Sequence, residues 1–328
     1  MPDADPLLKL LDLGHIGLSR CLHVVAELGI ADVLGEAPET PAVLAKKADV
    51  NADALGRILR LLAANGIFED LGGTFRHSPA SRFLRSDHPQ SQRGYVRFMG
   101  APLLWNAMGA LAHTLRTGRP GTETFAPEGQ FAYLSAHPEE ARVFDQAMTA
   151  KSVIDVASVV KAYDFSRVKL IGDIGGGRGH LLRAILEATP SVKGVLFDLP
   201  HVVAQAGSAT ARLTIQGGDF FKDALPACDL YMLMNVIHDW SDRDATRILK
   251  AVRQAALPGA KLLLIESLLP EKPEPNPVYM LDIVMLAVVG GRERKRSEYE
   301  ALLAEAGFRL QRVIPTGTGM DIIEAALA

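Results

Sequence analysis

This sequence of 328 residues contains little cysteine, no long apolar run and no excess of basic charge. Its two cysteines, Cys21 and Cys228, lie far apart and outside any CxxC pair, so we expect neither a disulfide framework nor a structural zinc site. The longest apolar runs, such as residues 283–291, fall far short of the roughly 18 residues that cross a membrane. Basic residues number 35 and acidic residues 38, which disfavours nucleic-acid binding by bulk charge.

The first residues also lack the pattern of a secretory signal. They read MPDADP, with two aspartates and no basic cluster. Hydrophobic residues make up 48% and charged residues 22%, which is the composition of a globular protein, and the length corresponds to about two domains. We therefore expect a cytoplasmic protein of two main parts whose partners are neither membranes nor nucleic acids.

Residues 1 to about 163 are predicted to be mostly helical. Asn51 is placed to cap a helix in which apolar residues recur at helical spacing, namely Leu55, Ile58, Leu59 and Leu62. Residues 67–70 and 74–77, separated by two glycines, are typical of a short hairpin. Helices followed by a hairpin predict a winged helix. Because acidic residues surround the arginines of its last helix, we interpret it as a dimerisation surface, with DNA binding as the alternative.

From about residue 165, apolar runs alternate with helix-like stretches. This pattern predicts a doubly wound parallel α/β sheet with a ligand site at the carboxyl ends of its strands. The expected strands are residues 168–174, 194–198, 213–216, 229–237 and 261–267, with a closing pair at 309–315 and 319–326. Capping boxes, Ser241 with Asp244 and Ser297 with Glu300, are predicted to begin two of the helices.

The loop after the first of these strands is rich in glycine and reads DIGGGRGH over residues 173–180. Glycine permits a sharp turn and a close approach of the backbone to a ligand. A dinucleotide site would need a glycine where His180 stands. The sequence instead has an acidic residue followed by glycines at alternate positions, which favours S-adenosylmethionine (SAM) over NAD.

Residues suited to a ligand also follow the next three strands. Asp198 lies 23 residues after Gly175, where a carboxylate accepts both ribose hydroxyls of an adenosyl group. Asp219 suits the adenine amino group and Phe220 its ring, although a core role is equally compatible with Phe220. His238 follows the fourth strand, and its ordinary pKa of about 6.5 would leave a neutral base available at pH 7.

Five motifs carry a family resemblance: DIGGGRGHLL at 173–182, FDLP at 197–200, GGDFF at 217–221, HDWSD at 238–242 and GGRER at 290–294. With them the chain resembles, over nearly its whole length, the SAM-dependent O-methyltransferases of the caffeic-acid and hydroxyindole type. The resemblance implies a Rossmann-like methyltransferase sheet behind an N-terminal helical winged-helix dimerisation domain. It divides the chain into residues 1–95 for dimerisation, 96–163 for part of the acceptor pocket and 164–328 for SAM binding and catalysis.

The resemblance also implies roles for single residues. The catalytic set is His238 as general base with its acidic partners Glu266 and Glu293. The cofactor set is Gly175, Gly177, Asp198, Asp219, Phe220, Asn235 and Ser152. The acceptor set is Trp105, Phe144, Met148, Asp239 and Met285. Lys151 replaces a histidine of the plant enzymes, and Asn235 stands near their cofactor-contacting lysine, which argues against a plant-type acceptor.

From these residues we predict a homodimeric enzyme that moves a methyl group from SAM to a hydroxyl of an aromatic or polyketide-like small molecule, leaving S-adenosylhomocysteine (SAH). A base is useful because a phenol has a pKa of about 10, and a carboxylate on the other imidazole nitrogen fixes the tautomer. No metal is expected, because no His, Cys or Asp cluster stands at ligand spacing.

Alternatives remain open at two levels. For Glu293, the alternative is a surface ion pair with Arg292 or Arg294. For the whole chain, the alternatives are a SAM-binding relative that performs hydroxylation or decarboxylation, a DNA-binding regulator and, disfavoured by His180, a nicotinamide dehydrogenase.

Overall fold

The computed structural model describes residues 5–328, except for the side chain of Val153, and divides them into two compact units. Unit 1 comprises residues 5–105 and Tyr133–Lys151, and unit 2 comprises Asn106–Ala132 and Ser152–Ala328. Residues 96–163 are thus shared between the units, and the three-part division made from the sequence stays a prediction. Within residues 5–328, no helix combines the length and the apolar character that crossing a membrane requires.

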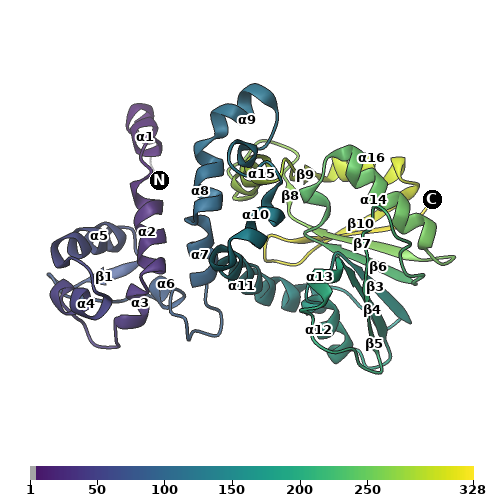
Figure 1. Cartoon of the computed structure of the whole chain (residues 1–328), viewed down its shortest axis with the longest axis horizontal. Coiled ribbons are helices and arrows are strands. Elements are labelled where there is room, and N and C mark those ends of the chain that lie inside the picture. The colour runs from purple at the N-terminus through teal and green to yellow at the C-terminus, as the bar shows by residue number, and fades with distance from the viewer. Residues whose placement is uncertain (1–4) are drawn as a thin grey trace. The chain divides into compact units, whose positions relative to one another are not determined.

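Unit 1 begins with helices and contains one short hairpin (Figure 1). Up to residue 99 its elements are α1 (Pro6–Leu13), α2 (Gly17–Glu27), α3 (Ile30–Val33), α4 (Pro41–Ala48), α5 (Ala52–Ala64), β1 (Phe68–Asp70), β2 (Phe75–His77), α6 (Pro79–Arg82) and α7 (Arg93–Met99). The Asn51 side chain accepts a hydrogen bond of 3.0 Å from the N–H of Ala54, which confirms the predicted cap. Leu59, Leu62 and Phe68 are fully buried in its core.

The helices between residues 102 and 162 are divided between the two units. They are α8 (Pro102–Gly109), α9 (Leu111–Thr117), the 3₁₀ helix η1 (Gly121–Thr124), α10 (Gln130–Ala136) and the long α11 (Pro138–Ala162). Within unit 2, the Thr122 hydroxyl donates to the Val288 carbonyl at 2.7 Å. This buried bond ties η1 to the end of α15 (Val278–Val288).

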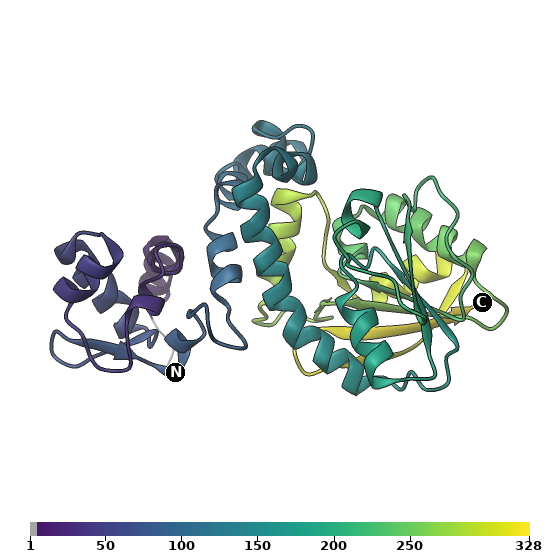
Figure 2. The same cartoon turned by 60° about the horizontal axis from the view of Figure 1, so that its bottom comes forward.

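Unit 2 is built on a seven-stranded sheet with the order β10-β11-β7-β6-β3-β4-β5 (Figures 1 and 2). The strands β3 (Leu170–Ile174), β4 (Lys193–Asp198), β5 (Leu213–Gly217), β6 (Leu230–Met234) and β7 (Lys261–Glu266) are parallel, and β11 (Asp321–Leu327) pairs antiparallel with both β7 and β10 (Phe308–Pro315). From β3 the chain adds β4 and β5 toward one edge of the sheet, and then forms β6 on the other side of β3. The doubly wound sheet predicted from the sequence is therefore confirmed.

Helices cover both faces of this sheet. The end of α11, α12 (His180–Ala188) and α13 (Pro200–Val203) pack on one face, and α14 (Asp242–Ala255) and α16 (Arg296–Glu305) on the other. Side chains along the strands alternate between the two cores, so Leu262 and Leu264 face α14 while Leu263 and Ile265 face the opposite layer. Two strands of two residues, β8 (Leu268–Leu269) and β9 (Arg294–Lys295), pair beside the main sheet.

Two local predictions are wrong. The strand expected to reach residue 237 ends at Met234, because Asn235 turns with a φ of +52° and the next N–H groups bond to a side chain of β7. The cap of α16 is not formed by Ser297 with Glu300. Instead, the Glu298 carboxylate accepts the Lys295 N–H at 2.8 Å, and Ser297 lies inside the helix.

Candidate active site

The Gly-rich loop joins β3 to α12 at the carboxyl edge of the sheet. Gly175 and Gly177 have φ angles of +68° and +59°, a region that favours glycine, and the Gly175 N–H donates to the Phe197 carbonyl at 2.8 Å. A Cβ atom on Gly177 would meet no atom within 4 Å, so the backbone is open on that side. A Cβ atom on Gly175 would lie 2.9 Å from Val236, so the loop packs against the turn that carries His238.

Asp198, at the end of β4, accepts a hydrogen bond from this loop. Its Oδ2 accepts the Gly177 N–H and its Oδ1 accepts the Leu199 N–H, both at 2.7 Å. Burial raises the pKa of Asp198, and these two hydrogen bonds oppose the rise. A carboxylate has about four lone-pair positions, so two remain for hydroxyl donors.

A second carboxylate, that of Asp173, lies under the loop. It is 1% exposed, and burial, followed by the charge of Asp198, raises the pKa of Asp173 to about 7. A Cβ atom on Gly176 would lie 2.5 Å from its Oδ2, so only glycine leaves room for this carboxylate.

The loop after β5 contains the residues expected at the adenine. The backbone of Asp219 follows Gly217, which pairs with Asp198, so both strand ends lie at the same edge. The Asp219 carboxylate accepts the Phe221 N–H at 2.9 Å and pairs with Lys222 at 2.8 Å. The Phe220 ring packs edge-on against Phe221 and is partly buried against the core, and its contact with adenine stays a prediction.

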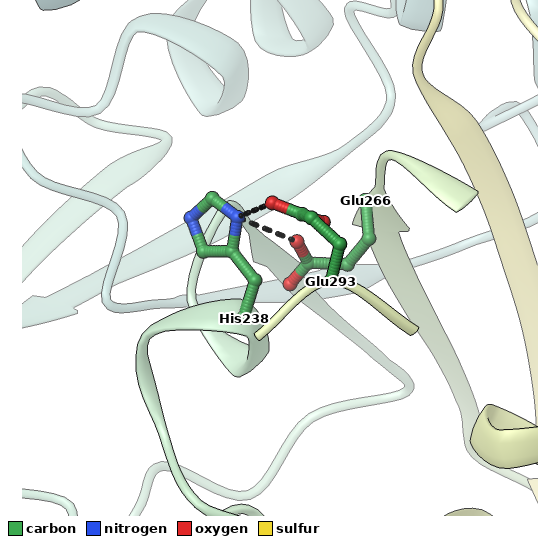
Figure 3. A group of neighbouring side chains, drawn as sticks. All are labelled: His238, Glu266 and Glu293. Atoms are coloured by element: carbon green, nitrogen blue, oxygen red, sulfur yellow. Dashed lines mark hydrogen bonds and ion pairs between the residues drawn. The ribbon is translucent and has the colours of Figure 1, made fainter. Parts of the chain in front are cut away.

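His238 lies in the 3₁₀ turn η2 (Ile237–Asp239) after β6 and is 6% exposed. Its Nδ1 lies 2.7 Å from Glu293 Oε1 and 3.8 Å from Glu266 Oε2 (Figure 3). Glu293 is 2% exposed, so the alternative of a surface ion pair is wrong. Because a carboxylate accepts at Nδ1, that nitrogen carries the proton and Nε2 is the nitrogen left for proton transfer.

Glu266, the last residue of β7, has a different set of contacts from Glu293. Its Oε1 accepts the N–H groups of Val236 and Ile237 at 3.2 and 2.8 Å, so it fixes the start of the turn. Its Oε2 has no hydrogen-bond partner among the described residues, and the same is true of Glu293 Oε2. Burial, against the charge of His238, raises the pKa of Glu266 to about 7.

The imidazole is strongly affected by these acids. Burial lowers the pKa of His238, but the charge of Glu266 and the hydrogen bond to Glu293 outweigh burial and raise it to about 9. The cation therefore predominates at pH 7, contrary to the expectation from the ordinary pKa.

The fold also assembles a group that the sequence spacing did not reveal. One donor atom each from His238, Glu266 and Glu293 lies within 4.8 Å of the others, although the residues are far apart in the chain. Such donors are able to bind a divalent cation. Here the Nδ1 atom is already engaged by Glu293, so we interpret the three as a proton-transfer group.

The segment 290–294 contains site residues that sequence reasoning missed. A Cβ atom on Gly291 would lie 2.1 Å from the His238 carbonyl oxygen, so only glycine fits there. Arg294 is 1% exposed and contacts the same turn, and Asp282 of α15 accepts the Glu293 N–H at 2.9 Å. The GGRER motif pointed to this segment, but only its glutamate was given a role.

The remaining predicted residues are spread over both units. In unit 2, Asn235 directly follows β6, and Asp239 Oδ1 lies 3.5 Å from His238 Nε2. Ser152 lies on α11 and Met285 on α15. In unit 1, Trp105 carries the Arg20 guanidinium over its ring at 4.5 Å, and Phe144 packs on Phe98 at 5.3 Å. Met148 lies on α11 in the same unit, and an acceptor role for these three stays a prediction.

Comparison with known proteins decides the family. Residues 107–309 match the sequence model of the O-methyltransferase domain, and residues 13–87 match that of the O-methyltransferase dimerisation domain. The chain belongs to the SAM-dependent O-methyltransferase family. The sequence-based recognition of this family is thereby confirmed.

Individual relatives are similar to this O-methyltransferase over almost its full length. A phenazine O-methyltransferase of Lysobacter antibioticus is 39% identical over 315 residues, 94% of this chain and 92% of the relative. An 8-amino-8-demethylriboflavin N,N-dimethyltransferase of Streptomyces davaonensis is 38% identical over 315 residues, 92% of this chain and 90% of that relative. The crystal structure of human N-acetylserotonin methyltransferase in complex with SAM matches with a TM-score of 0.89 and 31% identity, covering 100% of this chain and 99% of that one.

Proposed function

We propose that this enzyme methylates a hydroxyl of an aromatic or polyketide-like small molecule, with His238 as the general base. The observation that carries the proposal is the buried imidazole, held at Nδ1 by Glu293, on a turn that packs against the Gly-rich loop. The named acceptors of the relatives, a phenazine and N-acetylserotonin, are aromatic.

The residues fit SAM as the methyl donor. Gly175 and Gly177 form a loop with an open side, and Asp198 keeps two lone-pair positions for the ribose hydroxyls. Asp219, Phe220, Asn235 and Ser152 complete the proposed cofactor set. Bound SAM would supply a methyl group on a positively charged sulfur, which makes that carbon electrophilic.

The chain itself contributes proton removal and orientation. In the neutral imidazole, Nε2 accepts the hydroxyl proton, and Glu293 stabilises the cation that results. Asp239 lies on the Nε2 side of the ring and stabilises the same cation. Glu266 holds the turn through two backbone N–H groups, so the ring is already aligned before the acceptor arrives.

A homodimer is part of the proposal. The match of residues 13–87 to the dimerisation domain supports it. Within the described chain, α1 buries none of its side chains, and its leucines are exposed; for example, Leu10 is 68% and Leu13 76% exposed. An apolar helix that its own chain does not cover needs a partner surface.

The test begins with calorimetric titration of the purified protein with SAH, using NADH as the comparison. We expect micromolar binding of SAH and none of NADH. Deuterated-methyl SAM is then supplied with a hydroxyphenazine, N-acetylserotonin, catechol and an aromatic amine, and products are read by mass spectrometry. The proposal is supported if the label is found on a hydroxyl and its rate of incorporation is at least about 100-fold lower in His238→Ala. Absence of SAH binding, or an undiminished His238→Ala, overturns it.

A second candidate is methylation of an aromatic amine. The relative that dimethylates an amino-riboflavin is nearly as similar to this chain as the phenazine enzyme is. A neutral aromatic amine attacks before it loses its proton, so its methylation depends less on a base than that of a phenol does. Label on nitrogen with a small effect of His238→Ala would favour this candidate.

A further inference from the structure

Arg294 is a buried cation next to the turn that carries His238, and its three guanidinium nitrogens all donate hydrogen bonds. Its Nη1 donates to the Ile237 carbonyl at 3.1 Å, and its Nη2 donates to the Trp240 carbonyl at 2.8 Å. Its Nε and Nη2 donate to Asp242 Oδ1 at 2.9 and 2.8 Å. These contacts begin one residue before His238 and end four residues after it, so the guanidinium spans the turn.

The backbone next to Arg294 binds the same turn. The Arg292 N–H donates to the His238 carbonyl at 2.8 Å, and Gly291 lies against that carbonyl with no room for a Cβ atom. Glu293, between the two arginines, bonds to the imidazole. One segment of four residues therefore fixes both the backbone and the ring of His238.

A buried arginine contributes little to the stability of a fold, because the desolvation free energy of the charge offsets most of the favourable energy of its contacts. Its geometry explains its use here, since a planar guanidinium offers donors in fixed directions that lysine does not reproduce. Two backbone carbonyls and one carboxylate receive those donors. These fixed donor directions limit the movement of the turn, and in enzymes a misplacement of about 1 Å can lower the rate about 100-fold.

We propose that Arg294 is a positioning residue that, anchored by Asp242, holds the turn so that the His238 ring stays on Glu293. The inference rests on the proposed role of His238 as the base. Arg294 does not touch the reacting atoms; it acts through the carbonyl groups on either side of the histidine.

The experiment follows the imidazole directly, so it needs no acceptor. SAH-bound protein carrying ¹⁵N-labelled histidine is titrated with pH by NMR, and His238→Gln assigns the His238 signals. The variants are Arg294→Met, Arg294→Lys and Asp242→Asn. Arg292→Met is the matched control, because its exposed side chain also reaches Asp242, at 3.3 Å, while its backbone N–H is retained.

The direction of the shift separates positioning from simple electrostatics. The charged groups that act on the ring are Glu266, Glu293 and Asp239. Tyr299, which lies beside Arg294, interacts with the same two glutamates. Loss of a nearby cation alone would raise the pKa of His238. Loss of the contact with Glu293 would lower it from about 9. Positioning therefore predicts a lower pKa in Arg294→Met, a smaller decrease in Arg294→Lys and Asp242→Asn, and no change in Arg292→Met.

SAH affinity within threefold of the parent shows that a variant is folded. If Arg294→Met does not fold, Arg294→Lys and Asp242→Asn decide the question. An unchanged or raised pKa of His238 in the folded variants overturns the inference. If instead His238→Ala keeps full methyl transfer while Arg294→Met shifts the imidazole, the proposed function fails and the positioning contact stands.

Discussion

The sharpest prediction concerns the dependence of methyl transfer on pH. The pKa of His238 is raised from 6.5 to about 9, which corresponds to about 3 kcal/mol in favour of the cation. At pH 7 about 1% of the imidazole is then neutral, and at pH 9 about half is. If Nε2 is the base, kcat should rise about tenfold from pH 7 to pH 8 and about 50-fold from pH 7 to pH 9.

The acceptor can imitate this rise, because a phenol ionises with a pKa of about 10. The substitution Glu293→Gln separates the two causes with one acceptor. An amide still accepts from Nδ1–H but carries no charge, so the pKa of His238 should fall. The acidic limb of the plot of kcat against pH should then move to lower pH. Ionisation of the acceptor would leave the limb in place.

The assay is kcat between pH 6 and pH 10 for the parent and Glu293→Gln, with saturating SAM and production of SAH as the readout. His238→Ala reports the pH dependence that remains without the base. Because His238 and its two glutamates titrate together, the limb reports the group rather than one residue. A parent rate that is flat from pH 7 to pH 9 would refute the reasoning, as would an unmoved limb in Glu293→Gln.

Three further predictions concern binding, stability and assembly. Asp198→Ala should weaken SAH binding by about 1–3 kcal/mol in calorimetry, through lost charged hydrogen bonds, and unchanged affinity would place the ribose contact elsewhere. The folded pKa of Asp173, about 7, lies above its unfolded value of 3.8, so its protonated form favours folding, and stability declines by up to about 4 kcal/mol as pH rises from about 4 to about 7. Thermal unfolding of Asp173→Asn should therefore depend less on pH between about 4 and 7 than that of the parent, and equal slopes would contradict this. Leu7→Lys with Leu11→Lys, at sites 60% and 54% exposed, should convert a dimer to monomers in light scattering, and a persistent dimer would exclude α1 from the interface.

Strand periodicity and glycine spacing were sufficient to predict the sheet and the glycine-rich turn at its carboxyl edge. The alternation of Leu262 to Ile265 between two buried faces is visible in the sequence as one apolar run. The glycines at 175 and 177 have left-handed angles, which agree with the sharp turn expected of this loop. These features depend on neighbours in the chain, which a sequence displays directly.

Long-range pairing could not be read in the same way. Glu266 and Glu293 both appeared as partners of His238, but only contact across the fold distinguishes the ring-bound acid from the one that binds the backbone of the turn. The raised pKa of the imidazole follows from those same distances and from burial. Arg294 looked like an ordinary surface charge, because nothing in its neighbours along the chain reveals that it is buried.

The location of the proton-transfer group has a consequence for how this protein can diversify. His238, its glutamates, Arg294 and the Gly-rich loop all belong to unit 2, whereas Trp105, Phe144 and Met148 belong to unit 1. Changes in unit 1 can therefore accumulate without altering the hydrogen bonds around His238. An engineer who exchanges residues of unit 1 leaves those hydrogen bonds in place.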